Sequence, residues 1–262
     1  MNGQLIDLTV WQLLAAYLFI VILLVISKWK GIRREREIML STVRMTLQLI
    51  LVGYVLVYIF ANSHPLLTVL WVGVMLGFAI HTVFNRAGKN LSSGLKRTII
   101  FSMIVGFAAS MSYFIFAVLH LTPWYEPRYV IPIAGMVIGN SMTGITLGVT
   151  TLIDGMKTNR AKIEAALMMG ATPKIAAADI GRKAFDAAML PTINSMLGMG
   201  IVFLPGMMTG QILSGTSPLL AVEYQIAIML GIVGSTSLAV ILFVQIGYRS
   251  FFNRRSQLIE MK

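Results

Sequence analysis

The sequence predicts an all-α integral membrane protein with about seven transmembrane helices, folded as a single domain over residues 1–262. Hydrophobic residues make up 57% of the chain and charged residues only 12%, whereas soluble domains carry about 25% charged residues. The mean hydropathy is +0.81. One core cannot bury this much apolar surface in a chain of 262 residues, so we expect lipid to cover part of it.

Apolar runs of sufficient length define the expected spans, because about 20 residues at helical rise cross a hydrocarbon core. Residues 62–65 alone join the second and third runs, which predicts a tight hairpin closed by proline. The leading segment of the first run carries Asp7 and no Lys or Arg, and no small-residue cleavage pattern follows, so it does not resemble a cleaved signal peptide. The runs cover residues 5–26, 38–61, 66–84, 98–121, 130–153, 191–213 and 222–247.

Lys and Arg gather in alternate connecting segments, and this bias predicts the orientation. They are concentrated in segments 27–37, 85–97 and 154–190 and in the C-terminal tail. The intervening segments 1–7, 62–65, 122–129 and 214–221 hold one basic residue, Arg128. Because basic loops stay in the cytoplasm, we expect the N-terminus outside, and the C-terminus and the long loop 154–190 inside.

Composition also excludes several functions. The net charge of +11 does not indicate nucleic-acid binding, because the charges cluster between apolar runs. A chain with zero cysteines has no disulfides, thiolate metal sites or cysteine nucleophiles. The three histidines, His64, His81 and His120, are scattered without an i,i+4 pair, so the sequence assigns no residue to a metal. No cofactor is expected in the chain itself.

The cytoplasmic loop 154–190 is predicted to form a helical hairpin. Its first half is a good helix former up to Met169, and Gly170 suits a left-handed C-cap. Thr172 followed by Pro173 is typical of an N-cap with proline at the first helical position. We expect a second helix from there toward residue 190, with Asp179–Lys183 and Arg182–Asp186 as i,i+4 pairs.

Three interpretations of this hairpin compete. It could be a solvated connector, a basic helix resting on anionic headgroups, or a docking element for another protein. Ala and Gly at the bend favour docking, because small side chains let a second backbone come close.

The hairpin also resembles a known motif. The pattern Glu164-Ala165-Ala166, three residues, Gly170, nine residues and Ile180 matches the EAA loop of ABC-transporter permeases, whose short helix couples to the ATPase subunit. Arg182-Lys183 replaces the usual Leu-Pro of that motif, and Leu190-Pro191 comes later. The residues that the resemblance assigns to coupling are Glu164, Ala165, Ala166, Gly170, Ala171, Thr172 and Pro173.

The surrounding sequence resembles the Fet-type metal-export permeases, proposed to export iron from bacteria and related to plant permeases linked to aluminium tolerance. The resemblance runs from about residue 44 to 249 and is most specific in segments 130–142, 170–174, 204–215 and 221–226. It implies a homodimeric permease in a bacterial plasma membrane, the inner membrane in a Gram-negative cell, with a metal ion as substrate. Lipid would surround it, and no nucleic acid would bind.

A separate energy source follows from a missing motif. The chain contains no G-x-x-x-x-G-K-[ST] phosphate cradle, so we do not expect it to be an enzyme that hydrolyses ATP. A partner ABC ATPase subunit would bind ATP and Mg²⁺. The hairpin would be the site at which that subunit docks and transmits its movement.

Deep polar residues indicate where cargo could pass, because polar groups in a bilayer usually face protein or water. Asn140 and Ser141 lie near the middle of run five, and Gln48 near the middle of run two. Glycines flank Asn140 at spacings that suit close helix packing, so a hydrogen bond across a helix contact is the alternative to a path role. We favour a path for Asn140.

Run six carries a proline, which predicts an interrupted helix. We expect residues 204–211 to form an unwound or kinked half-helix of the kind that transporters use to expose backbone groups. Glu223 is the acidic residue at the outer edge of run seven and would guard the external mouth, or else sit in interfacial water. These considerations add to the candidate path the residues Pro205, Gly206, Met207, Met208, Gln211 and Glu223.

Two other classes of function are weighed against the ABC permease. A stand-alone secondary transporter or channel would need ionisable groups inside its spans, and the span interiors hold almost none. An intramembrane enzyme would need a catalytic pair or a metal motif at depth, and neither HExxH nor GxSxG occurs.

Overall fold

The computed structural model describes residues 9–32, 34–88, 91–253 and 255–259, and these form helices and connecting loops. The predicted position of the N-terminus rests on residues 1–8, which lie outside the described residues. Within the described part, six helical segments are long and apolar enough to cross a membrane. The all-α membrane fold predicted from composition is therefore confirmed at that level.

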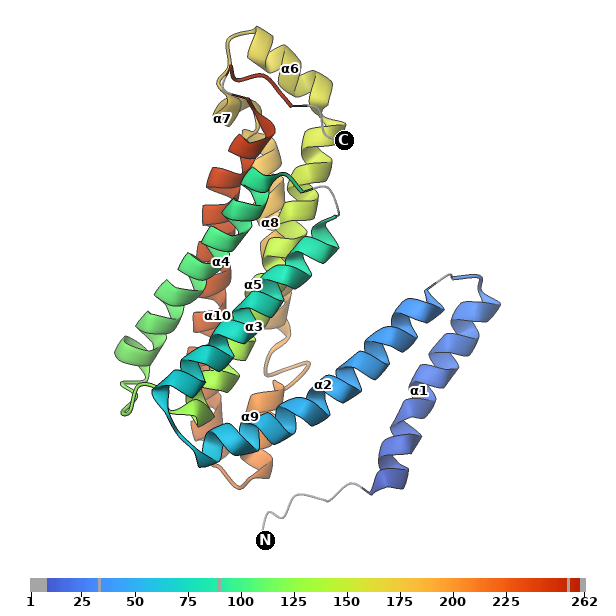
Figure 1. Ribbon diagram of the computed structural model, residues 1–262, viewed down its shortest axis with the longest axis vertical. Helices are drawn as coiled ribbons and strands as arrows, with labels where there is room; N and C mark the ends of the chain where they lie inside the picture. The colour runs from blue at the N-terminus through green and yellow to red at the C-terminus, as the bar shows by residue number, and fades with distance from the viewer. Residues whose placement is uncertain (1–8, 33, 89–90, 254, 260–262) are drawn as a thin grey trace.

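A bundle of five long helices forms the body of the protein (Figure 1). The helix at its centre is α5, which packs against α3, α8 and α10. The α10 helix in turn packs closely against α4. The bundle helices are α3 (Pro65–Ala87), α4 (Ser93–Tyr113, continued by the π-helical segment η1, Phe114–Val118), α5 (Pro127–Thr158), α8 (Ala178–Gly198) and α10 (Pro218–Gly247).

Glycines allow these helices to approach closely. A Cβ added at Gly144 would lie 2.8 Å from Cγ2 of Thr236 and 3.2 Å from the carbonyl oxygen of Ala188. At Gly106, an added Cβ would lie 2.9 Å from the Cα of Ala239. The first glycine therefore sets the spacing of α5 to α8 and α10, and the second sets the spacing of α4 to α10.

The first two helices, α1 (Val10–Trp29) and α2 (Glu35–Ala61), form a hairpin that stands beside the bundle (Figure 1). The hydroxyls of Tyr17 and Thr46, 2.5 Å apart, share a hydrogen bond between the two helices. The guanidinium of Arg44 lies 5.2 Å from the centre of the Phe78 ring on α3. Most apolar side chains of this hairpin are exposed, as expected of helices in contact with lipid.

The predicted sixth span is not one continuous helix, so the described residues hold six helices long and apolar enough to span a membrane, where the sequence suggested about seven. The second helix of the predicted loop hairpin does not end near Leu190. Instead α8 continues through Pro191 to Gly198, and a non-helical segment, residues 199–205, separates it from α9 (Gly206–Leu213).

The interruption begins several residues before Pro205. Gly200 has a φ of +84°, and its N–H donates to the carbonyl of Phe203 at 3.0 Å. The Phe203 ring then packs on Gly198, where an added Cβ would lie 2.9 Å from a ring atom. The prediction of a broken helix is thus confirmed, but the unwound part is 199–205, and Gly206 to Gln211 are helical.

Three of the basic segments lie toward one end of the molecule. Figure 1 shows the facing ends of α3 and α4, the helices α6 (Arg160–Met168) and α7 (Pro173–Ala176), and the C-terminal segment in the upper half of the view, while the turn between α1 and α2 lies near mid-height. The α2–α3, α4–α5 and α9–α10 connections lie at the opposite end. Successive connections therefore alternate between a basic side and a side poor in Lys and Arg, which is the arrangement that the charge bias predicts.

We predict that Gly106→Ala destabilises the protein by about 1–3 kcal/mol, because its Cβ would meet the Ala239 backbone in a packed contact. The matched control is Gly73→Ala on α3, where nothing lies within 4 Å of the added carbon. Thermal unfolding in detergent should lower the Tm of the first variant only. Equal unfolding temperatures for the two variants would contradict the close α4–α10 packing.

Candidate functional site

The hairpin turn has the local geometry that its residues predict. The first helix, α6 (Arg160–Met168), is followed by Gly170 with a φ of +89°, in the left-handed region. The hydroxyl oxygen of Thr172 accepts a hydrogen bond from the N–H of Ile175 at 3.4 Å. Pro173 is the first residue of the next helix, α7 (Pro173–Ala176). The predicted helix ends at Gly170 and Thr172 are confirmed.

Other details of the hairpin differ from expectation. The helix preceding the turn is divided at Asn159, because α5 extends to Thr158 before α6 begins. The ion pair on α8 joins Asp179 to Arg182, three residues apart, in place of the two i,i+4 pairs predicted. The hydrogen bond from Arg182 and then its charge hold the pKa of Asp179 below its usual value.

The base of the hairpin is fastened to the bundle while its tip is open. A Cβ at Gly155 of α5 would lie 2.5 Å from Cγ2 of Ile180 on α8, so these two helices touch there. Ile163 of α6 is fully buried. In contrast, nothing lies within 4 Å of a Cβ built at Gly170. The hairpin is therefore anchored at one end and accessible at the other.

Three exposed apolar side chains lie at the tip of the hairpin, residues 168–175. They were assigned no role from the sequence. Met168 is 83% exposed, Met169 82% and Ile175 67%. The helices α6 and α7, between which the turn lies, are at the top of the view, beyond the bundle (Figure 1). Exposed apolar side chains outside the membrane are typical of an interaction site when they gather. The signal available beforehand was a Met-Met pair beside a glycine turn inside a basic loop.

The seven residues assigned to coupling fall along this hairpin. Glu164 is half-buried, and its carboxylate pairs with Arg160 at 2.8 Å. Gly170 and Thr172 are exposed at the turn. Half-buried positions next to them are Ala166, Ala171 and Pro173, while Ala165 is exposed. The pairing stiffens α6, and the small residues leave the turn free of bulk.

Asn140 and Ser141, adjacent in the sequence, lie on different faces of α5. The Ser141 side chain is buried, and its hydroxyl lies 3.3 Å from that of Ser235 on α10. Ser235 continues the chain by donating to the carbonyl of Gly106 at 3.4 Å. Asn140 is half-buried, and its amide donates to the Met136 carbonyl at 2.8 Å. The geometry thus gives Ser141 a packing environment and leaves Asn140 toward the open side.

The remaining path candidates are dispersed. Gln48 is exposed on α2, in the hairpin that stands beside the bundle. Pro205 is the N-cap of α9 and Gly206 its first residue. Within that short helix Met208 is buried, while Met207 and Gln211 are half-buried. The structure does not gather these residues with Asn140 into one cluster.

Gln225, which the sequence placed with Glu223 at the external mouth, is buried beside the helix break. Gln225 on α10 is 5% exposed, and its amide nitrogen lies 3.8 Å from the sulfur of Met199. Its Oε1 has no hydrogen-bond partner among the described residues. An unpaired polar atom is costly in an apolar environment. The amide type was visible in the sequence, but its burial depends on the fold of segment 199–205.

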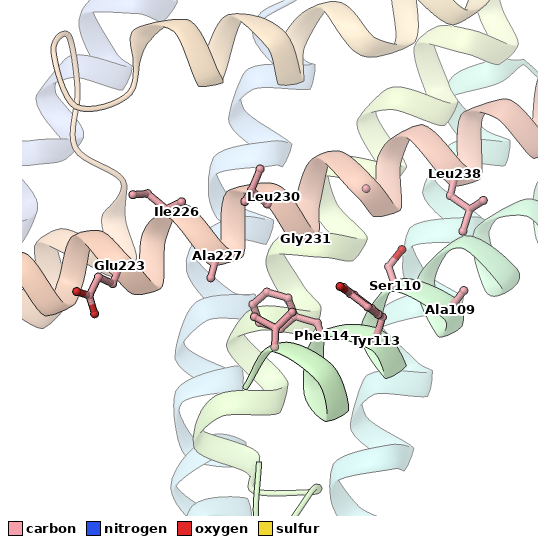
Figure 2. Close-up of a pocket in the computed structure, with 12 residues that line it drawn as sticks. Ala109, Ser110, Tyr113, Phe114, Glu223, Ile226, Ala227, Leu230, Gly231 and Leu238 are labelled. Atoms are coloured by element: carbon pink, nitrogen blue, oxygen red, sulfur yellow. The ribbon is translucent and has the colours of Figure 1, made fainter. Parts of the chain in front are cut away.

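Glu223 lines a cavity of about 770 Å³ between α4 and α10. Figure 2 shows Glu223 at one end of the row of lining residues on α10, with Tyr113 and Phe114 across from the middle of that row. Ser110 adds a hydroxyl, and the other walls are mostly apolar. The carboxylate is exposed, so it lies at a mouth of this cavity.

A preformed metal centre is not evident. Within the parts of the chain that the structure describes, no three His, Cys, Asp or Glu residues lie close enough to hold an ion together.

These features define a multi-pass helical membrane protein with a broken helix and an anchored hairpin at one end. Residues 10–252 match the model of the Uncharacterised protein family (UPF0014). The chain belongs to that family. No solved structure matches it.

Three relatives illustrate the range of the family. The chain is 35% identical to the Probable iron export permease protein FetB of Escherichia coli, over 97% of this chain and 96% of that protein. It is 36% identical to the UPF0014 membrane protein YjkA of Bacillus subtilis, over 92% and 94%. It is 34% identical to Protein ALUMINUM SENSITIVE 3 of Arabidopsis thaliana, over 93% and 88%. The resemblance stated from sequence motifs is confirmed.

We predict that Ser141→Ala destabilises the protein by about 1 kcal/mol, because it removes a buried hydrogen bond between α5 and α10. Ser112→Ala, at an exposed position of α4, is the control and should leave stability unchanged. Unfolding titrations in detergent measure both. If Ser141→Ala kept full stability but lost transport, Ser141 would belong to the translocation path and not to the packing between helices.

Proposed function

We propose that this chain is the transmembrane subunit of an ABC transporter that exports a metal cation, iron being the favoured cargo. A separate ATPase subunit binds ATP and Mg²⁺, and two copies of the chain assemble with two ATPase subunits. The transporter lies in the plasma membrane of a bacterium, with the hairpin end in the cytoplasm and the N-terminus outside.

The observation that carries the proposal is the apolar tip formed by Met168, Met169 and Ile175. Burying such side chains in a partner yields about 25 cal/mol for each Å² of apolar surface removed from water. Methionine suits a docking surface because its flexible side chain adapts to the partner's shape. The fastened base, at Gly155 and Ile180, lets a force applied at the tip reach α5.

Other observations support the same function. The hairpin lies at the end where Lys and Arg gather, which favours a cytoplasmic location for it. The sequence has no phosphate cradle of its own, so ATP-driven transport would use a nucleotide site on another chain. The cargo and the direction of transport come from the names of the relatives, of which one is an iron export permease and another refers to aluminium sensitivity.

We predict that the double variant Met168→Gln, Met169→Gln lowers co-purification of the ATPase subunit at least tenfold, which corresponds to about 1.4 kcal/mol of lost docking energy. Lys162→Gln, an exposed change on the same helix, is the control. Both proteins should insert into membranes normally, as measured by the yield of folded permease. Retention of the ATPase by the methionine variant would contradict docking at the tip.

Vanadate-sensitive ATP hydrolysis by the reconstituted complex separates the proposal from a stand-alone transporter or channel. Solute movement by the isolated permease, with no nucleotide hydrolysed, would favour that alternative.

A further inference from the structure

One face of α5 is left open by the bundle, and it is unusually polar for a helix at membrane depth. Thr143, Thr150 and Asp154 follow Asn140 by 3, 10 and 14 residues, which places all four within about 80° of one another on one face of the helix. Thr143 and Asp154 are exposed, and the other two are half-buried. Leu147, exposed as well, lies on the same face between the two threonines. The opposite face, with Ser141 and its neighbours, packs against α8 and α10.

The hydrogen bonds on this face all point inward, toward the helix's own backbone. The Asn140 amide donates to the Met136 carbonyl at 2.8 Å. The Thr143 hydroxyl donates to the Gly139 carbonyl at 3.1 Å. The Thr150 hydroxyl donates to the Thr146 carbonyl at 3.0 Å.

Because the threonine hydroxyls are occupied as donors, their oxygens face outward as acceptors, whereas the Asn140 amide has a second N–H beside its carbonyl oxygen. A threonine hydroxyl that donates its proton keeps lone pairs on the same oxygen, and Asn140 keeps its carbonyl oxygen. Thr146, beside the row, donates to the Met142 carbonyl at 2.7 Å and repeats the pattern. The carboxylate of Asp154 ends the row, and within the described residues the structure forms no ion pair there.

Rows of neutral oxygens that end at a carboxylate favour cations over anions. Hard cations prefer oxygen ligands and exchange them with water. The row is about 21 Å long at 1.5 Å per residue. It occupies the half of α5 nearer the hairpin, since Met136 and Pro132 continue the face in the other half. Lys157, one turn beyond Asp154, is the basic side chain nearest to the row on α5.

We infer that Asn140, Thr143, Thr150 and Asp154 form a ladder of oxygen acceptors that carries a hard, partly hydrated cation between the cytoplasmic end and the middle of the membrane. This inference rests on the proposed function and goes beyond it, because it assigns the cargo a ligand chemistry and three residues not previously considered. Asp154 attracts cations at the cytoplasmic end of the row, and Asn140 is the ligand nearest the middle of the membrane.

Threonines that bond their own helix are common in this protein, so the alignment on α5 is what distinguishes the row. Thr82 on α3 is half-buried and makes the same bond, to Phe78 at 2.9 Å. Thr42 and Thr46 on α2 make it as well. Among the described residues, α5 is the helix on which such threonines share a face with a half-buried amide and a carboxylate.

The first test asks whether the ladder faces water. Since the chain has no native cysteine, Thr143→Cys and Ile104→Cys each carry a single thiol. Both native side chains are exposed well inside their helices, Ile104 at 43%. A charged methanethiosulfonate reagent in inside-out vesicles should modify position 143 at least about tenfold faster, because it cannot enter lipid. Equal rates would overturn the inference, whatever the fate of the ATPase.

The second test asks whether the oxygens bind cation, with Mn²⁺ as the probe in reconstituted vesicles containing the ATPase. The double variant Thr143→Val, Thr150→Val should raise the Mn²⁺ concentration for half-maximal stimulation of ATP hydrolysis about tenfold. Each lost ligand contact is expected to lower the affinity for Mn²⁺ by a factor of a few. Thr143→Ser, Thr150→Ser keeps the oxygens and should behave as the unmodified protein. Thr82→Val is the matched control.

The outcomes separate the two levels of the proposal. Unchanged Mn²⁺ stimulation in the valine variant, or stimulation by citrate without metal, would overturn the ladder while leaving the ABC function intact. Failure of the unmodified chain to bind an ATPase would contradict the proposed function. The thiol reactivity at position 143 would then still show whether this face of α5 is accessible to water.

Discussion

The close contact of α5 with α8 is the constraint on which the rest of the structure depends. Gly144 and Gly155 on α5 admit the backbone of Ala188 and the side chain of Ile180, and bulk at either glycine would separate the helices. Because α8 begins in the hairpin and α5 reaches the opposite end of the bundle, their contact joins the hairpin to the membrane-spanning body (Figure 1). Packed helices of this kind transmit displacement because interiors are dense and resist compression.

The same packing divides α5 into two faces with different uses. The face that meets α8 and α10 carries glycines and the buried Ser141, and its side chains hold the bundle together. The other face carries Asn140 and the threonines, whose hydroxyls, like one N–H of Asn140, bond carbonyls of the same helix. A displacement delivered through α8 would therefore move the open face as a unit. In this account the packed helices α8 and α5 connect the exposed methionines of the tip to the oxygen atoms of the ladder as one rigid body.

Local chemistry allowed much of this to be predicted, and long-range packing explains what was missed. The turn at Gly170, Thr172 and Pro173 followed from backbone preferences that act within a few residues. The break in the sixth run was expected at Pro205 but lies at 199–205, because Gly200 and the seating of Phe203 on Gly198 determine it. Helical periodicity separates Asn140 from Ser141, yet only the neighbouring helices reveal which of them is buried.

A disulfide between positions 155 and 180 tests the central claim, that hairpin and bundle move as one body, most directly. The Cβ of Ile180 lies 3.6 Å from a Cβ built at Gly155, within the range of about 3.5–4.5 Å that disulfides require. With no other cysteine in the chain, Gly155→Cys, Ile180→Cys can be oxidised and reduced at will. The account predicts equal ATP-driven transport in the oxidised and reduced forms. Loss of transport on oxidation, restored by reduction, would contradict it, because the hairpin would then have to swing on α5.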